Sequence, residues 1–460
     1  MLCSIVQNGP ESVDIGQVLQ QASLQAVRPY LSDEDILTAC RAAGHRWRNR
    51  RYGPVVTVLH FVAQAIGREQ SFAATWQNLF TPAVVNLPGL QLEDADDSGL
   101  THARRRLPVE VMQNLAEQAC ARTRDLGKRG WRRLNLLGLD TTVVSMPDEK
   151  PLHQFFGTHR PRGIACRYPL ATFASLLSLE SSLIRAWRFG PYDPGEIATC
   201  LPLLPSIARG DLLLADRRFA GAPFLAKIRQ RGAQFLVRKH QRLNVQRLPV
   251  LRRLGQNDFI TQLTLSPEAR KKDPTLPKKL RVRIFRATWT TPAGERLVGW
   301  FVTSLLQTHK FPKRTLAKLY HFRWRQETSF LEYKQIFHAD VLRSKTVPNI
   351  HKEFAAHLLA YQLVRRLIVA AAHQHQIPPT QISFLGAARW TMSFSAAMSV
   401  VEPNRLPELF QQLLDCIATC KVDVRPGRVE PRWISREDKH FPKRRISRAQ
   451  WRARRLGRST

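Results

Sequence analysis

The sequence is short of acidic residues. Against 71 Lys and Arg it has 36 Asp and Glu, so the formal net charge of the 460 residues is +35 and the isoelectric point is about 11. A surplus of this size repels itself unless a polyanion offsets it. Nucleic acid is therefore the expected partner, with an anionic membrane surface as the alternative.

The sequence also lacks a long uncharged apolar run. The longest, near residues 54–67, is too short to cross a bilayer and contains His60. The first residues, MLCSIVQNGPESVDI, lack the basic start and the apolar core of a signal peptide. We therefore expect no membrane partner and a cytoplasmic location.

Cysteine is scarce and irregularly placed. The seven cysteines are an odd number scattered over the chain, which argues against a disulfide framework and fits a reducing compartment. Cys416 and Cys420 are four residues apart, but no paired Cys or His cluster follows them, so we interpret them as buried helix residues. The sequence shows no internal repeat of 20–50 residues.

Hydrophobic periodicity divides the chain into regions of different type. It predicts an α/β protein in which a mixed sheet is covered by helices. The last forty residues carry 14 Lys or Arg against 4 Asp or Glu and have little apolar periodicity. The predicted regions are a helical DNA-binding domain at 1–130, the first part of the α/β core at 131–240, a β-rich insertion at 241–310, the second part of the core at 311–376, and a C-terminal region with a basic tail at 377–460.

Two aspartates follow buried apolar runs. Asp140 comes after LNLLGL and Asp216 after DLLLA, so each is expected on a strand or at its end. A carboxylate there is costly unless it is solvated, paired or bound to metal. For either aspartate alone, a strand-end cap or a surface ion pair is the favoured interpretation.

A third carboxylate lies on a predicted amphipathic helix, TLAKLYHFRWRQETSFLEYKQIF. At about 100° per residue, Tyr320, Arg323, Glu327 and Lys334 share an arc roughly 60° wide. Arg325 lies about 140° from the mean of this stripe, so its removal is expected to have little effect on activity. Without the two aspartates, a solvated face with ordinary ion pairs would be the favoured interpretation.

Three carboxylates from two strands and a helix can converge on one point. They are too few to enclose magnesium, which keeps several waters and takes phosphate oxygens from its substrate. An open acidic triad therefore suits two-metal chemistry on a phosphodiester, in which one ion activates the attacking oxygen and the other stabilises the leaving oxygen.

These residues together resemble the DDE transposases of bacterial insertion sequences, in the group with a Tyr-x2-Arg-x3-Glu-x6-Lys signature. The resemblance lies in GLDTT around Asp140, LLLADRRF around Asp216, and the four helix residues. The intervals also agree, since 216 − 140 = 76 and 327 − 216 = 111 residues. THARRRLP, GAQFLVRK, RPGR and FPKRR extend the similarity over most of the chain.

The resemblance implies an RNase H-like core with a β-rich insertion before the glutamate helix. It implies a protein that binds the terminal inverted repeats of its element, cleaves at the element ends and transfers the 3′ ends to target DNA. Asp140, Asp216 and Glu327 would be catalytic metal ligands for Mg²⁺, or Mn²⁺, with two ions per site. Tyr320, Arg323 and Lys334 would contact DNA phosphates.

Further expectations follow from the same resemblance. The protein would act as a homodimer on paired double-stranded DNA ends and associate with the bacterial nucleoid. Some members of the group hold an unstacked base against a tryptophan of the insertion, for which Trp300 is the first candidate and Trp289 the second. A buried strand tryptophan is the competing interpretation. Arg217 and Arg218 depart from the family pattern, in which a small residue often follows one arginine.

Two other functions share part of this pattern. A non-catalytic DNA-binding regulator derived from a transposase would keep the positive charge without needing the acidic triad. A structure-specific nuclease would share the metal site without joining ends. All three acids, the insertion and the Tyr-Arg-Lys face are present, and together they favour the transposase.

Overall fold

The structure is a computed structural model. It describes residues 19–20, 23–48, 52–67, 71–86, 98–122, 130–159, 168–192, 195–290 and 296–422. The predicted basic tail after residue 422 therefore lies outside the described residues.

The N-terminal region is helical, as the periodicity predicts. Ser32 begins the first of its long helices with a capping box, in which the Ser32 and Asp35 side chains each bond to the other's backbone amide. Pro54 occupies the first turn of another, where a missing amide hydrogen costs nothing. The elements are η1 (Gln25–Val27), α2 (Asp33–Ala42), α3 (Pro54–Ile66), α4 (Phe72–Asn86), α5 (Ser98–Arg106) and α6 (Val109–Ala121).

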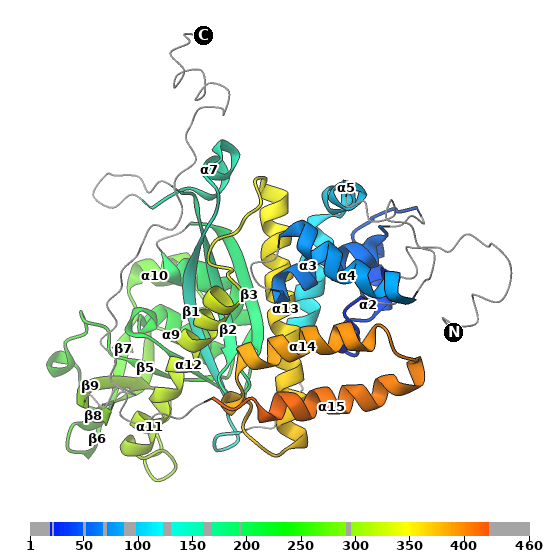
Figure 1. Cartoon of the computed structure of the whole chain (residues 1–460). Helices are drawn as coiled ribbons and strands as arrows, with labels where there is room; N and C mark the ends of the chain where they lie inside the picture. The colour runs from blue at the N-terminus through cyan, green and yellow to red at the C-terminus, as the bar shows by residue number, and fades with distance from the viewer. Residues whose placement is uncertain are drawn as a thin grey trace, which may run out of the picture.

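The centre of the molecule is a mixed sheet (Figure 1), which begins with five strands in the order β3-β2-β1-β4-β5. β2 is antiparallel to both β1 and β3, whereas β4 is parallel to both β1 and β5. This is an RNase H-like core. Its strands are β1 (Asn135–Ser145), β2 (Leu170–Ser178), β3 (Ile184–Pro191), β4 (Asp211–Ala215) and β5 (Gln234–Arg238), with helices α7 (Lys150–Phe156), α8 (Glu196–Cys200), η4 (Leu201–Ser206), η5 (Arg217–Phe219) and α9 (Ala222–Gln230) between them.

The β-rich insertion continues this sheet. Its last strand, β9, pairs antiparallel with β5, and β8, β7 and β6 follow outward, so the described residues form one nine-stranded sheet. A buried ion pair anchors the insertion, since Arg283 contacts Asp258 at 2.8 and 2.6 Å and also donates to the Phe311 carbonyl at 2.6 Å. Its elements are η6 (Val245–Arg247), β6 (Arg252–Gly255), β7 (Asp258–Thr264), α10 (Pro267–Lys272), β8 (Lys279–Thr290) and β9 (Arg296–Thr303).

The two faces of the sheet belong to two hydrophobic cores. On β4, Leu212 and Leu214 lie in the core shared with α13 (Val347–Gln374), whereas Leu213 and Ala215 lie in the core shared with α9. The alternation follows from the two-residue period of a strand. α13 is long and apolar enough to cross a membrane, but 78% of its apolar window is buried inside the protein, as in a core helix.

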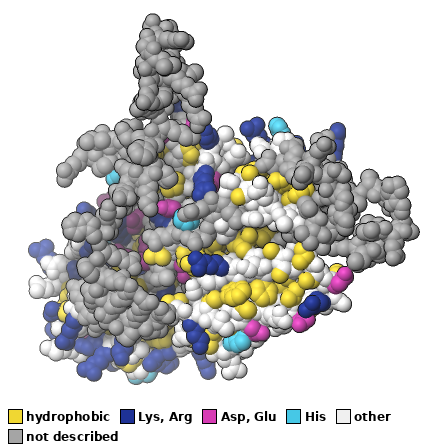
Figure 2. Space-filling model, in the orientation of Figure 1, with side chains coloured by type: hydrophobic (Ala, Val, Ile, Leu, Met, Phe, Trp, Pro, Cys, Tyr) yellow, Lys and Arg dark blue, Asp and Glu magenta, His cyan; other side chains and the backbone are white. Residues whose placement is uncertain are grey.

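The C-terminal region adds helices beside α13 (Figure 1). They are η9 (Pro379–Gln381), α14 (Phe384–Met398), η10 (Pro403–Arg405) and α15 (Leu406–Thr419). Cys416 and Cys420 are half-buried, and the Cys420 thiol points to the Cys416 carbonyl at 3.5 Å. Figure 2 shows hydrophobic side chains along the α14 and α15 side of the molecule and Lys and Arg side chains around the insertion.

The helix predicted to carry the Tyr-Arg-Glu-Lys stripe is not uniform. Its backbone stays in the right-handed helical region, but it divides into α11 (Lys313–Tyr320), the 3₁₀ turn η7 (His321–Arg323), α12 (Trp324–Leu331) and the π-helical turn η8 (Glu332–Ile336). A 3₁₀ turn holds fewer residues per turn than an α-helix and a π turn holds more. The uniform 100° step behind the predicted stripe is therefore wrong in detail.

Candidate active site

Asp140 lies within β1, on the face that α12 covers. Its neighbour Leu139 belongs to the core on the α9 side, so Asp140 points to the opposite side. Its cross-strand partner is Ser175, and the Gln326 side chain of α12 donates to the Ser175 hydroxyl at 2.7 Å. The Thr141 amide donates to the Asp140 carboxylate at 2.8 Å.

Gly138 lets α12 approach β1 closely. A Cβ atom at this position would lie 2.8 Å from the Gln326 Oε1 atom and 2.8 Å from a methyl group of Leu179. Contacts this short force a shift of the neighbours, so only glycine allows the observed packing. The glycine two residues before Asp140 therefore helps to set the distance between that aspartate and the Glu327 helix.

Asp216 follows β4 and precedes the short turn η5. The parallel register of β1 and β4 pairs Leu139 with Ala215, so Asp140 and Asp216 are the next residues on two adjacent strands. Asp216 is the N-cap residue of η5, and its carbonyl accepts a hydrogen bond from the Phe219 amide at 3.0 Å. The sheet thus brings together two carboxylates that are 76 residues apart in the sequence.

Glu327 and Arg323 form an ion pair on the helix. Arg323 Nη2 lies 2.9 Å from Glu327 Oε1, and the arginine side chain is 12% exposed whereas the glutamate is 41% exposed. The Arg323 Nε atom is buried and has no hydrogen-bond partner among the described residues. A buried guanidinium with a spare donor is suited to an incoming anion.

Tyr320 is buried under the second aspartate. Its hydroxyl donates to the Ala215 carbonyl at 3.2 Å, and its ring packs edge-on against Phe301 at 5.1 Å. The Arg323 guanidinium lies 5.8 Å from the centre of the Tyr320 ring. Tyr320 therefore connects the end of β4, where Asp216 follows, to the helix that holds Arg323.

Charged neighbours act on Asp140 and on Arg323. Burial raises the pKa of Asp140 to about 6, while the Thr141 amide and Arg323 oppose the rise and Glu196 and Glu327 add to it. Burial alone would lower the pKa of Arg323, but Tyr320, Glu327 and Asp216 around it raise the pKa overall. Arg323 is thus electrostatically coupled to Asp140, Asp216 and Glu327.

This arrangement is open. Among the described residues, no three Asp, Glu, His or Cys side chains stand close enough to enclose a metal ion. The burial of Asp140 beside other carboxylates nonetheless favours a cation, because positive charge would offset their repulsion. Oxygen donors from Asp140, Asp216 and Glu327 fit a hard divalent ion that takes its remaining ligands from water and phosphate.

The remaining predicted site residues are Lys334 and Trp300, which lie on different elements. Lys334 is half-buried in η8, beyond Glu327 on the same helical path. Trp300 lies on β9 and packs into the core on the α9 side, whereas the adjacent Phe301 faces Tyr320. Trp300 therefore lies on the sheet face opposite Tyr320, as in the competing interpretation of a structural strand tryptophan. Its base-stacking role stays a prediction.

The sequence did not reveal Glu196, a fourth carboxylate of this region. Glu196 opens the short helix α8, contributes to the raised pKa of Asp140, and pairs with Arg218. No spacing in PGEIATC signals this position, because only the fold brings it near Asp140. The pair also gives Arg218, one of the two arginines that depart from the family pattern, a partner inside the protein.

Arg325 has a structural role that its helical phase did not indicate. Its guanidinium donates to the Leu179 carbonyl at 2.7 Å and lies 4.4 Å from the centre of the Phe322 ring. It holds α12 against the turn between β2 and β3. The expectation that removing Arg325 matters little for activity stays a prediction, but these contacts give the residue a structural role.

Comparison with known proteins places this site in a family. Residues 136–363 match a family model described as a transposase DDE domain. Over 447 residues the chain is 26% identical to the transposase InsG for insertion sequence element IS4 of Escherichia coli (strain K12), covering 93% of this chain and 97% of that protein. A cryo-EM structure of the piggyBac transposase synaptic complex with hairpin DNA is similar with a TM-score of 0.43 at 11% identity, covering 88% of this chain and 86% of that chain.

Proposed function

Because the chain is a DDE transposase, we propose that it binds the terminal inverted repeats of its insertion sequence, cleaves at the element ends and transfers the 3′ ends to target DNA. DDE transposases use divalent metal ions. The observation that supports the proposal is the adjacent strand register of Asp140 and Asp216, together with the ion pair of Glu327 with Arg323.

The three carboxylates would hold two Mg²⁺ or Mn²⁺ ions. When bound, the ions supply Lewis-acid stabilisation of the attacking and leaving oxygens at the scissile phosphate. The protein contributes position: β1 and β4 fix the two aspartates in register, and α12, packed on Gly138, carries the glutamate. Burial is the main cause of the raised pKa of Asp140, and the nearby Glu196 and Glu327 add to it, so a bound cation would stabilise the ionised carboxylate.

The basic side chains beside the acids would bind the DNA backbone. The buried Arg323 Nε is free to donate to a phosphate oxygen while Nη2 keeps its bond to Glu327. Tyr320 would hold this arginine in place through the contacts of its ring and of its hydroxyl with Ala215. Lys334 would reach a neighbouring phosphate from the next part of the helical path. Outside this site, the helical N-terminal region and the basic tail would bind the ends, and two copies of the chain would hold the paired ends.

The test separates binding from chemistry. Asp140→Asn, Asp216→Asn and Glu327→Gln keep the shape of each side chain but remove the charge. Since metal ions contribute several kcal/mol to the transition state, each variant should lose cleavage and joining by more than about a thousandfold. Binding to the DNA that flanks the coding sequence should stay within about threefold, because cations make those contacts.

Glu408→Gln is the matched control, since Glu408 is an exposed glutamate of α15 away from the sheet. It should cleave at the rate of the unmodified protein. Magnesium-dependent cleavage by an acidic-triad variant at a rate near that of the control would show that these residues are not the metal ligands.

A further inference from the structure

The helical path that carries Glu327 ends in the π-helical turn η8. The Phe337 amide donates to the Glu332 carbonyl, five residues earlier, at 3.3 Å. Such turns are rare and frequently occur at functional sites. Lys334 lies inside this turn, so the widened turn sets the direction of the Lys334 side chain relative to Glu327.

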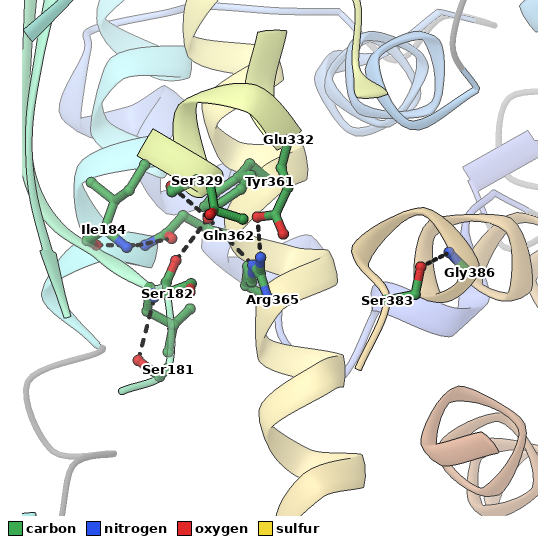
Figure 3. A network of polar contacts seen from close by, with 12 residues as sticks. Ser181, Ser182, Ile184, Ser329, Glu332, Tyr361, Gln362, Arg365, Ser383 and Gly386 are labelled. Atoms are coloured by element: carbon green, nitrogen blue, oxygen red, sulfur yellow. Dashed lines mark hydrogen bonds and ion pairs between the residues drawn. The ribbon is translucent and has the colours of Figure 1, made fainter. Parts of the chain in front are cut away.

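The side chain that opens the turn is held in the protein interior (Figure 3). The Glu332 carboxylate pairs with the guanidinium of Arg365 on α13, and the two residues are 9% and 2% exposed. Arg365 Nε also donates to the Tyr361 hydroxyl at 3.3 Å. Glu332 therefore fixes the π turn twice, through its carbonyl along the helix and through its carboxylate across to α13.

Tyr361 links this ion pair to two other elements. Its hydroxyl donates to the Ser182 carbonyl at 2.8 Å and shares a hydrogen bond of 2.8 Å with the Ser329 hydroxyl of α12. Ser182 lies in the turn between β2 and β3 and has a φ of 58°, a conformation that non-glycine residues adopt rarely. We call Ser182, Ser329, Glu332, Tyr361 and Arg365 the Tyr361 network.

A buried ion pair is weak evidence of a contribution to general stability. Apolar residues of similar volume stabilise a protein interior as well as a buried ion pair does, or better, because charges are costly to desolvate. The ion pair and its hydrogen bonds hold the elements that they join in one relative arrangement. Here those elements are α12, the π turn and α13.

We propose that the Tyr361 network positions the π-helical turn and so fixes where the Lys334 ammonium lies relative to Glu327. Tyr361, Glu332 and Arg365 are positioning residues, since they act on DNA through Lys334. The inference rests on the proposed function, in which Lys334 binds a phosphate beside the scissile one. Without this anchor, a change in the π turn would change the direction of the Lys334 side chain relative to Glu327.

The experiment is a double-mutant cycle with the full-length protein, magnesium and the flanking DNA ends. Strand-transfer rates are measured at saturating protein for the unmodified chain, Tyr361→Phe, Lys334→Ala and the double variant. Tyr361→Phe should lower the rate by about tenfold in the unmodified chain but by less than about twofold in the Lys334→Ala background, because the contact it positions is already missing.

Thr261→Val is the matched control. Thr261 is fully buried on β7, and its hydroxyl donates to the Pro249 carbonyl at 2.6 Å, so the substitution also removes one buried hydroxyl without a change of shape. Melting curves of the Thr261→Val and Tyr361→Phe variants report the folding cost of each lost hydroxyl. The control should change strand transfer by less than about twofold in either background.

Equal losses from Tyr361→Phe in both backgrounds would overturn the inference and leave the DNA contact of Lys334 standing. A Tyr361→Phe rate equal to that of the unmodified chain would do the same. If Lys334→Ala alone leaves the rate unchanged, the proposed DNA contact fails, and the inference fails with it.

Discussion

Arg323 is the residue on which the proposed active site depends most closely. It pairs with Glu327 at 2.9 Å, is coupled electrostatically to both aspartates, and keeps a buried Nε without a partner among the described residues. A guanidinium can serve a carboxylate and a phosphate at once because its donors point in fixed, separate directions. A lysine at this position would keep the positive charge but would not present a second donor, fixed in another direction, to the phosphate.

Arg323→Lys should therefore lower strand transfer by about tenfold or more, since a lost charge-assisted hydrogen bond is worth about 1.5–3 kcal/mol. Arg314→Lys is the control, because Arg314 is an exposed arginine in the first turn of α11. The measurement is the strand-transfer rate at fixed salt with saturating DNA ends. Equal rates for the two variants would mean that charge alone matters at position 323.

Single residues show where sequence reasoning was sufficient. Asp140 and Asp216 were identified because a carboxylate after a buried apolar run is unusual, and the parallel register of β1 and β4 places them side by side. Their roles as metal ligands stay a prediction. The proximity of Glu196 to Asp140 and the hydrogen bond of Arg325 to the Leu179 carbonyl could not be predicted from the sequence. Both depend on neighbours that only the folded chain brings together.

At the scale of secondary structure, the sequence predicted the helices and strands better than the geometry within a helix. The helical N-terminal region, the strands of the core and the helix after the insertion all appear in the structure. The 3₁₀ turn at η7 and the π turn at η8 were not predictable from periodicity, because a shift in helix type follows from tertiary contacts. In this chain Glu332, the first residue of η8, pairs with Arg365 of α13.

The helix α5 depends on a side chain from α13. Lys352 is 1% exposed, and its Nζ donates to the carbonyls of Arg104, Arg105 and Leu107 at 2.6, 3.4 and 3.0 Å. The carbonyls at a helix C-terminus have no partners within the helix, so this ammonium caps α5 and ties the N-terminal region to the core.

Lys352→Met keeps the length and apolar stem of the side chain but leaves these carbonyls without their donor. The free energy of unfolding should fall by about 2 kcal/mol, the cost of buried acceptors left unpaired. Amide exchange measured by mass spectrometry should speed up in α5. Lys345→Met, in the exposed loop before α13, is the control and should change neither quantity. Unchanged α5 exchange in Lys352→Met would show that water replaces the cap.

At the scale of the whole molecule, the sequence predicted a β-rich insertion before the glutamate helix but not how this insertion attaches to the core. A separate β-rich unit and a continuation of the core sheet have the same strand pattern. The choice is made by the pairing of β9 with β5, which are about sixty residues apart along the chain. This pairing also decides which way Trp300 faces, so the face of the sheet on which it lies could not be read from sequence.

The net charge of +35 predicts that the affinity of the chain for DNA depends strongly on salt concentration. Each phosphate that a cation neutralises adds about 0.9 to the slope of log affinity against log salt, so binding should weaken steeply as salt rises. The structure shows where the tail can be removed cleanly. Lys421 forms an isolated antiparallel β-bridge with Ile382, and the Val422 amide donates to the Gln381 carbonyl at 2.8 Å. Because both residues are held by the folded chain, a deletion should begin after Val422.

Residues 423–460 hold 13 Lys or Arg against 4 Asp or Glu, which is the 14 of the last forty residues less Lys421. If this segment lies along DNA, its deletion should reduce the salt slope by roughly two or more. A variant that keeps the segment but changes its Lys and Arg to Gln should reproduce the loss, because counterion release depends on charge and not on the presence of the chain. The measurement is end binding by titration at several salt concentrations. An unchanged slope after deletion would mean that the core and the N-terminal helices make the phosphate contacts, and a loss seen only on deletion would mean that the segment acts other than through its charge.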